Sequence, residues 1–340
     1  MSNSAVSLAL VGATGVVGAK IIKLLEKKSF PLARFIPLGH STVGNHISLN
    51  GEKYVVQSLE SFQPTTVNLI IFAAGSAAAH AHARAFVDAG AYVIDLSSYF
   101  RYEDDVPLVI PEINGHLLDQ LEKPSLIANP NCSTAQLLMA LKPIHDALNI
   151  ELMNVATYQA VSGTGKAALE ELHNQTYFTD SPQSPSVYPK QIAFNVIPQC
   201  DVFLDNNFTK EEMKLTWETH KILDPKIFVQ ATCARVPVFN GHSEAVFFKV
   251  SRGTSRDNII SILSGAEGVK VIDNPDELEY PTPVECANDT EDVFVGRIRV
   301  QELGGDTWVS LWIVADNVYG KGAALNAVQI AERLLQSKKL

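Results

Sequence analysis

Short apolar runs alternate with helix-like segments through the first third of the chain. Apolar residues recur at helical spacing in 16–28 and again in 76–90. Three runs lack the strict polar alternation of a half-exposed strand, namely VSLALV (6–11), VNLIIFAAG (67–75) and AYVIDLSS (91–98). Strands that are apolar on both faces and separated by helices predict a parallel sheet covered on both sides. The pattern therefore predicts an α/β domain.

The pattern changes near residue 150. Longer and more mixed strand candidates follow at 151–161, 226–238 and 243–251, and they predict an antiparallel sheet in a second domain. Residues 317–340 revert to an amphipathic helix, which we expect to pack back on the first domain. We predict a dinucleotide-binding domain at 1–128 completed by helix 318–340, and a catalytic domain at 129–317.

Composition narrows the classes of function. The 340 residues are 46% hydrophobic and 19% charged, enough apolar material for a sizeable core. A net charge of −10 argues against nucleic-acid and anionic-membrane partners, since both need a positive surface. No signal-like start or long apolar run is present, so we expect a cytoplasmic protein. The four scattered cysteines suit neither disulfides nor zinc, and we expect no metal.

A glycine-rich turn between the first strand and the first helix is the first chemical motif. In VGATGVVG (11–18), Gly12, Gly15 and Gly18 would let backbone N–H groups approach a pyrophosphate at the helix start. The alternative is a tight turn without a ligand. The loop after the second strand carries Ser41 and Thr42 and no acidic residue, which favours NADP over NAD. No tyrosine has a lysine four residues later, which argues against a short-chain reductase.

Cys132 lies in NPNCST (129–134), just before a helical pattern. A helix start favours a thiolate, and Ser133 or Thr134 is available as a cap. The alternative is a small buried hydrophobic residue, against which the polar neighbours argue. A thiolate in a nicotinamide-binding protein predicts covalent aldehyde oxidation. His242, seven residues after Arg235, is the candidate acid/base, the alternative being a surface turn histidine.

Seven segments together resemble aspartate-semialdehyde dehydrogenase, in order over nearly the whole chain. They are GATGVVG, SSYFRYEDDVPLVIPEIN, NPNCST, YQAVSGTGK, EEMKLTWETHKIL, RVPVFNGHSEA and ADNVYGKGAALNAVQIAE. The resemblance implies a Rossmann-type domain plus an α+β catalytic and dimerisation domain, and hence a homodimer. It also implies NADP-dependent interconversion of aspartate semialdehyde plus phosphate with aspartyl phosphate through a cysteine thioester. That reaction belongs to the biosynthesis of lysine, threonine and methionine.

The resemblance also implies roles for individual residues. Cys132 would be the nucleophile, His242 the acid/base, and Gln159 would orient the intermediate. Substrate would be bound by Arg235, Glu211 and Gln159, and phosphate by Arg101, Lys214 and Asn131. Cofactor contacts would come from Gly12, Thr14, Gly15, Val16, Val17, Ser41, Thr42, Ser162, Gly163 and Asn317. As alternatives, Arg101 and Lys214 could be surface cations and Gln159 could merely pair in a sheet.

Two positions depart from the family pattern. Many members have an Arg-Ser pair where this chain has Ser41-Thr42, and alanine is usual where it has Thr164. Two other functions are alternatives. One is a related acyl-phosphate reductase such as the acetylglutamyl-phosphate enzyme, which typically has glycine directly before the cysteine, where this chain has Asn131. The other is a paralogue that kept the fold and lost catalysis, against which the presence of Cys132, Gln159, Arg235 and His242 speaks.

Overall fold

A computed structural model describes residues 6–177 and 185–340. The chain separates into two compact units, residues 1–130 with 323–340 and residues 131–322. The first unit is therefore made from two distant parts of the sequence. Each unit has its own six-stranded sheet.

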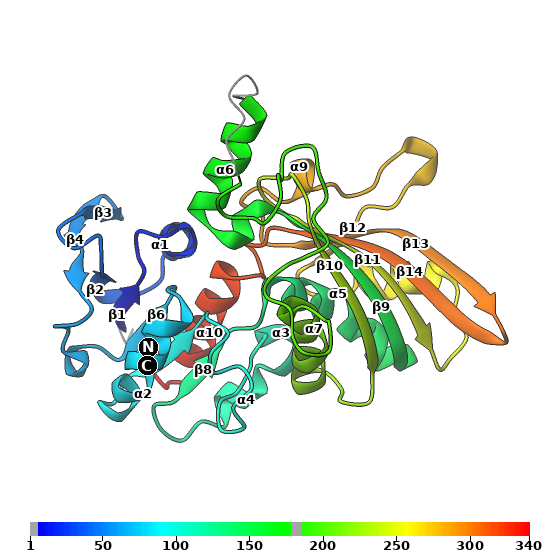
Figure 1. Cartoon of the computed structure of the whole chain (residues 1–340). Coiled ribbons are helices and arrows are strands. Elements are labelled where there is room, and N and C mark those ends of the chain that lie inside the picture. The colour runs from blue at the N-terminus through cyan, green and yellow to red at the C-terminus, as the bar shows by residue number, and fades with distance from the viewer. Residues whose placement is uncertain (1–5, 178–184) are drawn as a thin grey trace. The chain divides into compact units, whose positions relative to one another are not determined.

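The first unit is a parallel α/β fold with strand order β5-β2-β1-β6-β7-β8 (Figure 1). Its sheet contains β1 (Val6–Val11), β2 (Leu32–Gly39), β5 (Gln57–Ser58), β6 (Leu69–Phe72), β7 (Tyr92–Asp95) and β8 (Leu126–Ala128). A hairpin, β3 (His46–Leu49) with β4 (Glu52–Val55), follows β2. The helices are α1 (Val16–Lys27), η1 (Pro64–Thr66), α2 (Ser76–Asp88), α3 (Pro111–Asn114), α4 (His116–Asp119) and α10 (Ala324–Gln336). This unit confirms the predicted α/β class.

Helix α10 belongs to the first unit and packs against α1, α3 and α4. Its Asn326 Nδ2 donates to the carbonyl of Val109 at 2.9 Å and to Asn129 Oδ1 at 2.8 Å. The prediction of a helix from residue 317 was wrong at its start. Asp316 Oδ1 accepts hydrogen bonds from the N–H groups of the next turn, and the helix begins only at Ala324.

The second unit contains a mixed sheet with strand order β10-β9-β11-β14-β13-β12. Its strands are β9 (Ile150–Gln159), β10 (Phe228–Arg235), β11 (His242–Val250), β12 (Val269–Val271), β13 (Val293–Leu303) and β14 (Asp306–Ala315). The expected purely antiparallel sheet was wrong, because β10 pairs with β9 and β12 with β13 in parallel. The chain between β9 and β10 is long and contains helices, and such a connection allows parallel pairing.

Helices α5 (Cys132–Leu148) and α7 (Lys210–Ile222) lie against one face of this sheet (Figure 1). The remaining helices of the unit are η2 (Val161–Thr164), α6 (Lys166–Tyr177), α8 (Arg256–Ser264), η3 (Pro275–Glu277) and α9 (Pro283–Cys286). Tyr158, Phe247, Trp308 and Trp312 are on the opposite face and are only partly buried. Phe247 stacks on Trp308 with ring centroids 4.6 Å apart. We name these four residues the aromatic face.

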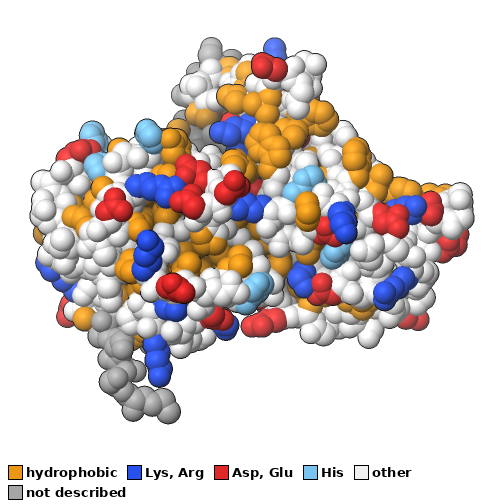
Figure 2. All heavy atoms as spheres, turned by 90° about the horizontal axis from the view of Figure 1, so that it is seen from below, with side chains coloured by type: hydrophobic (Ala, Val, Ile, Leu, Met, Phe, Trp, Pro, Cys, Tyr) orange, Lys and Arg blue, Asp and Glu red, His pale blue; other side chains and the backbone are white. Residues whose placement is uncertain are grey.

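Charged side chains of both signs are interspersed on the surface shown in Figure 2. Among the described residues, no helix has both the length and the apolar composition needed to span a bilayer. Within the same parts of the chain, no three His, Cys, Asp or Glu side chains are grouped so that they could hold a metal ion. None of the four cysteines, all of which lie in the described residues, forms a disulfide.

Candidate active site

In the glycine turn of the first unit, neighbouring backbone segments lie so close together that side chains would not fit. Gly12 has a φ of +79°, and an added Cβ there would lie 2.5 Å from the carbonyl oxygen of Ala73. A Cβ at Gly18 would lie 2.2 Å from the carbonyl oxygen of Gly12. Helix α1 begins at Val16 with Gly15 as its N-cap and no side-chain cap, so its first N–H groups are available to an anion. These features fit a dinucleotide pyrophosphate.

Two loops meet at the carboxyl edge of this sheet, where the strand order reverses on either side of β1. Gly12 N–H donates to the carbonyl of Leu38 at the end of β2 at 2.9 Å. The Thr14 hydroxyl donates to the Thr42 hydroxyl at 3.0 Å, while Ser41 is exposed. Such an edge is where open α/β sheets bind dinucleotides. Thr14 and Ser41-Thr42 are therefore brought together, and Val16 and Val17 follow in the first turn of α1.

Cys132 is the first residue of α5, in the second unit. The expected cap by Ser133 or Thr134 was wrong. Asn131 is the N-cap, and its Oδ1 accepts hydrogen bonds from the N–H groups of Ser133 at 3.0 Å and Thr134 at 3.2 Å. Ser and Thr cap only from the residue before the helix, and here both are already helical. Asn131 thus fixes the turn that carries the thiol.

Glu211 on α7 is the centre of a buried hydrogen-bond network. Its carboxylate accepts from Asn131 Nδ2 at 2.9 Å, from Gln159 Nε2 at 2.9 Å and from Lys214 Nζ at 2.8 Å. Burial alone would raise the pKa of Glu211, but the charge of Lys214 and these hydrogen bonds outweigh it and lower the pKa to about 2. The carboxylate is therefore ionised at neutral pH, and the network is fixed in one orientation.

His242 begins β11 and is fully buried, so the reading as a surface turn histidine is wrong. Its Nδ1 accepts a hydrogen bond from Ala160 N–H at 3.0 Å, so the proton of the neutral ring is on Nε2. Burial and, next, the charge of Arg235 lower the pKa of His242 to about 3. Nε2 is buried and has no hydrogen-bond partner within the described residues. The ring therefore presents an unused donor.

Gly163 lies directly against both His242 and Arg235. An added Cβ there would be 3.3 Å from His242 Nε2 and 3.2 Å from Arg235 Nη1. Arg235 Nη1 donates to the Ala160 carbonyl at 2.7 Å, and its Nε has no partner among the residues described. The loop after β9 therefore brings an imidazole donor and a guanidinium donor to the same place, and a side chain larger than hydrogen would crowd them.

The third part of the second-unit site is the turn that follows β14. The Ser162 hydroxyl donates to Asn317 Oδ1 at 3.1 Å, and Gly241 N–H donates to the same oxygen at 2.9 Å. Asn317 Nδ2 is buried and finds no partner in the described chain. A Cβ on Gly322 would lie 2.8 Å from Cys132 Cβ, so this turn lies against the thiol residue. A carboxamide acceptor, such as that of nicotinamide, fits the free Asn317 donor.

The two candidate phosphate cations are both buried, so the reading of them as surface cations is wrong. Arg101 is 6% exposed and donates from Nε to the Asn129 carbonyl at 2.9 Å. Lys214 is 8% exposed and forms an ion pair with Asp201 at 2.7 Å in addition to Glu211. Arg101 belongs to the first unit and Lys214 to the second.

Sequence reasoning missed Glu218 and assigned Ser133 the wrong role beside Cys132. Glu218 Oε2 accepts from the N–H of Asn131 at 2.6 Å, and the Ser133 hydroxyl accepts from Gln159 Nε2. A local signal existed for Glu218, since it lies seven residues after Glu211 and therefore on the same face of α7. Gln159 thus does more than pair in the sheet, because its amide joins Ser133 to Glu211.

Comparison with known proteins gives the family. The semialdehyde dehydrogenase NAD-binding domain matches residues 7–121, and the semialdehyde dehydrogenase dimerisation domain matches residues 141–319. The aspartate-semialdehyde dehydrogenase of Legionella pneumophila is 47% identical over 332 residues, which cover 96% of this chain and 95% of that protein. That of Aquifex aeolicus is 43% identical, over 97% of this chain and 98% of that protein. The chain belongs to the aspartate-semialdehyde dehydrogenase family.

Solved structures of the family agree in fold. Aspartate semialdehyde dehydrogenase II from Vibrio cholerae, complexed with ASA, has a TM-score of 0.94 and 42% identity. The similarity covers 98% of this chain and 99% of that one. The predicted combination of a Rossmann-type domain with an α+β domain is confirmed, and the dimerisation model marks the second domain as the one through which the family associates.

The burial of His242 predicts a specific pH dependence of stability. Its pKa is depressed in the folded chain, so the unfolded chain binds the extra proton between pH 6.5 and about 3. The contribution of His242 to stability is therefore full above pH 6.5 and falls, by up to about 1.4 kcal/mol per pH unit, as the pH is lowered.

Urea unfolding between pH 4.5 and 7.5 measures this effect. His242→Asn should flatten the dependence of the free energy of unfolding on pH. His46→Asn, which removes an exposed histidine, is the control and should keep the wild-type slope. Equal slopes for His242→Asn and wild type would show that His242 takes up its proton in the folded state.

Proposed function

We propose that this protein interconverts aspartate semialdehyde plus phosphate with aspartyl phosphate, using NADP and a thioester on Cys132. The observation that carries the proposal is the arrangement around the start of α5. Asn131 caps the helix at Cys132 and is tied through Glu211 to Gln159, while Arg235 and His242 meet at Gly163. A nucleophile, a carboxylate-binding guanidinium and a proton donor are the parts that this reaction needs.

The substrate carboxylate would bind the free donors of Arg235, since a guanidinium offers a bidentate fork. The thiolate of Cys132 would then attack the aldehyde carbon. Gln159 would orient the substrate, and Glu211 would hold both Gln159 and the first turn of α5 in place. A bound nicotinamide supplies a hydride acceptor, and loss of the hydride leaves the Cys132 thioester. Phosphate attack on the thioester carbonyl would release aspartyl phosphate and restore the thiolate.

His242 would act as a hydrogen-bond donor to the reacting oxygen. Its Nε2–H has no partner in the described chain, and its Nδ1 is occupied by Ala160 N–H. The ring can therefore stabilise the oxygen of the tetrahedral intermediate by donating from Nε2. Nε2 keeps its proton in this step, because its loss would leave an imidazolate anion, and Nδ1 keeps its hydrogen bond from Ala160 N–H.

Phosphate would bind through Arg101, Lys214 and Asn131. Lys214 carries two carboxylate partners, of which Asp201 is the more exposed, with 31% of its side-chain surface accessible against 9% for Glu211. An incoming phosphate can replace Asp201 without disturbing the buried pair with Glu211. Both ends of the Asn131 side-chain amide are already bonded, to Glu211 and to the helix start. Asn131 would therefore help phosphate binding by positioning these two groups.

The protein would work as a homodimer joined through the aromatic face. Four large aromatic side chains that are only partly buried form an unusual surface for an otherwise charged protein. Phe247→Glu should yield monomers of unchanged secondary structure, because a carboxylate would be buried without a partner. Sedimentation velocity measures the mass, with exposed Val55→Glu in the other unit as control. A Phe247→Glu variant that sediments as wild type would place the interface elsewhere.

Cys132→Ser tests the reaction itself. Turnover of aspartate semialdehyde, followed by NADPH formation in the presence of phosphate, should be lost, because a hydroxyl is far less nucleophilic than a thiolate at neutral pH. Cofactor binding and thermal unfolding should match wild type. Cys286→Ser, which alters a buried thiol of the same unit outside the site, is the control. Retention of most activity by Cys132→Ser would remove the thiol from the reaction.

Ser41→Arg tests the cofactor preference. Ser41 is exposed beside the Thr14–Thr42 pair, so an arginine there can reach a ribose 2′-phosphate. A charged hydrogen bond of about 1.5 to 3 kcal/mol would tighten NADP roughly ten- to a hundredfold and leave NAD nearly unchanged. The gain should shrink with added salt. Ser41→Gln, of similar length without charge, is the control, and equal effects on both cofactors would contradict the assignment.

A further inference from the structure

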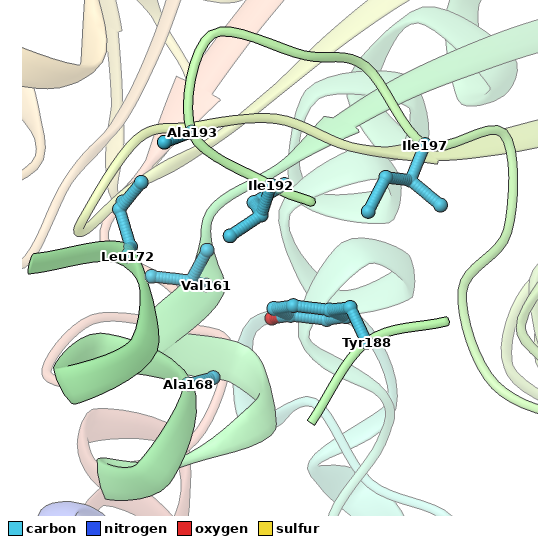
Figure 3. Packing of buried hydrophobic residues seen from close by; sticks show 7 residues of the cluster. All are labelled: Val161, Ala168, Leu172, Tyr188, Ile192, Ala193 and Ile197. Carbon is cyan, nitrogen blue, oxygen red and sulfur yellow. The ribbon is translucent and has the colours of Figure 1, made fainter. Parts of the chain in front are cut away.

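Tyr188 lies in the core of the second unit beside the proposed substrate residues. Its ring is 9% exposed and belongs to a cluster of apolar side chains from η2, α6 and the segment before α7 (Figure 3). The other members of this cluster are Val161, Ala168, Leu172, Ile192, Ala193 and Ile197. Figure 3 shows the Tyr188 ring next to Val161, the first residue of η2. The ring is therefore packed among apolar side chains.

One side of that ring carries the guanidinium of Arg235. The Cζ atom lies over the ring, 5.9 Å from its centroid. Arg235 is itself 7% exposed, and its Nη1 is bonded to the Ala160 carbonyl at 2.7 Å. A cation over an aromatic face is attracted by the ring electrons, and more strongly where water is excluded. The guanidinium is thus held by a ring, a carbonyl and the adjacent Gly163.

The hydroxyl of Tyr188 ties the same ring to the loop. It donates to Thr164 Oγ1 at 2.9 Å, and Thr164 is the last residue of η2. Burial raises the pKa of Tyr188, so the hydroxyl is neutral and keeps its proton for this bond. Thr164 is also the position where alanine is usual in the resemblance noted above. In this chain a side-chain bond therefore joins the loop to the ring that supports Arg235.

We propose that Tyr188 is a positioning residue for the substrate carboxylate, because it holds the Arg235 guanidinium in place and anchors the Ser162–Thr164 loop through Thr164. This inference rests on the proposed function, in which Arg235 binds that carboxylate. Nη1 of Arg235 is bonded to the Ala160 carbonyl and Nε is unpaired, so the orientation of the guanidinium decides where its remaining donors point. Loss of the ring would let it turn and weaken binding without changing the chemical step.

Steady-state kinetics with aspartate semialdehyde, phosphate and NADP test the proposal. Tyr188→Leu should raise KM for the aldehyde about three- to thirtyfold, the range expected for a lost cation–ring contact, with kcat within about twofold. KM for phosphate and for NADP should stay at the wild-type values. Tyr188→Phe keeps the ring face and should restore the aldehyde KM to within about threefold. Thr164→Ala should behave like Tyr188→Phe, because both remove the same hydrogen bond.

Leu172→Ala is the matched control, since it loosens the same cluster without removing the ring over Arg235. It should lower the melting temperature and leave the aldehyde KM unchanged. Should Tyr188→Leu fail to fold, Tyr188→Met fills a similar volume and replaces it. An unchanged aldehyde KM in that variant, or the same rise in Leu172→Ala, would overturn the proposal. Absence of turnover in wild type would instead refute the proposed function.

Discussion

The ionised carboxylate of Glu211 is the interaction on which the rest of the second-unit site depends. A buried charge is costly unless every oxygen is paired, and here the partners come from three elements: α7 itself, the end of β9 and the start of α5. Satisfying one carboxylate therefore fixes the relative positions of all three. Because Asn131 is also the helix cap, the same requirement determines where the thiol of Cys132 lies.

The opposite condition, polar atoms left without partners, marks where ligands can bind. His242 Nε2, Arg235 Nε, Asn317 Nδ2 and Gln159 Oε1 are all buried and unpaired within the described residues. Such groups cost free energy in a folded protein, which supports the proposal that they bind substrate and cofactor. Glu244 is also buried and lies two residues after His242 on β11. Its burial raises its pKa well above the usual range.

Local patterns allowed the fold class and the candidate residues to be predicted. The glycine turn, the helix start at Cys132 and the run of buried strands each depend on neighbours in sequence. Features set by distant residues could not be predicted in the same way. The parallel pairing of β9 with β10 follows from a long connection, the choice of Asn131 as cap is reinforced by Glu218, and the Arg235–Tyr188 contact joins segments that no periodic pattern relates.

The discontinuous first unit has a consequence for synthesis. Its sheet strands emerge from the ribosome first, but α10, whose Leu325, Val328, Ile330 and Leu334 are buried, emerges only after the entire second unit. Apolar surface on the nucleotide-binding unit must therefore remain uncovered while residues 131–322 are made and can fold. The core of the nucleotide-binding unit is thus completed only after the thiol-bearing unit has been synthesised.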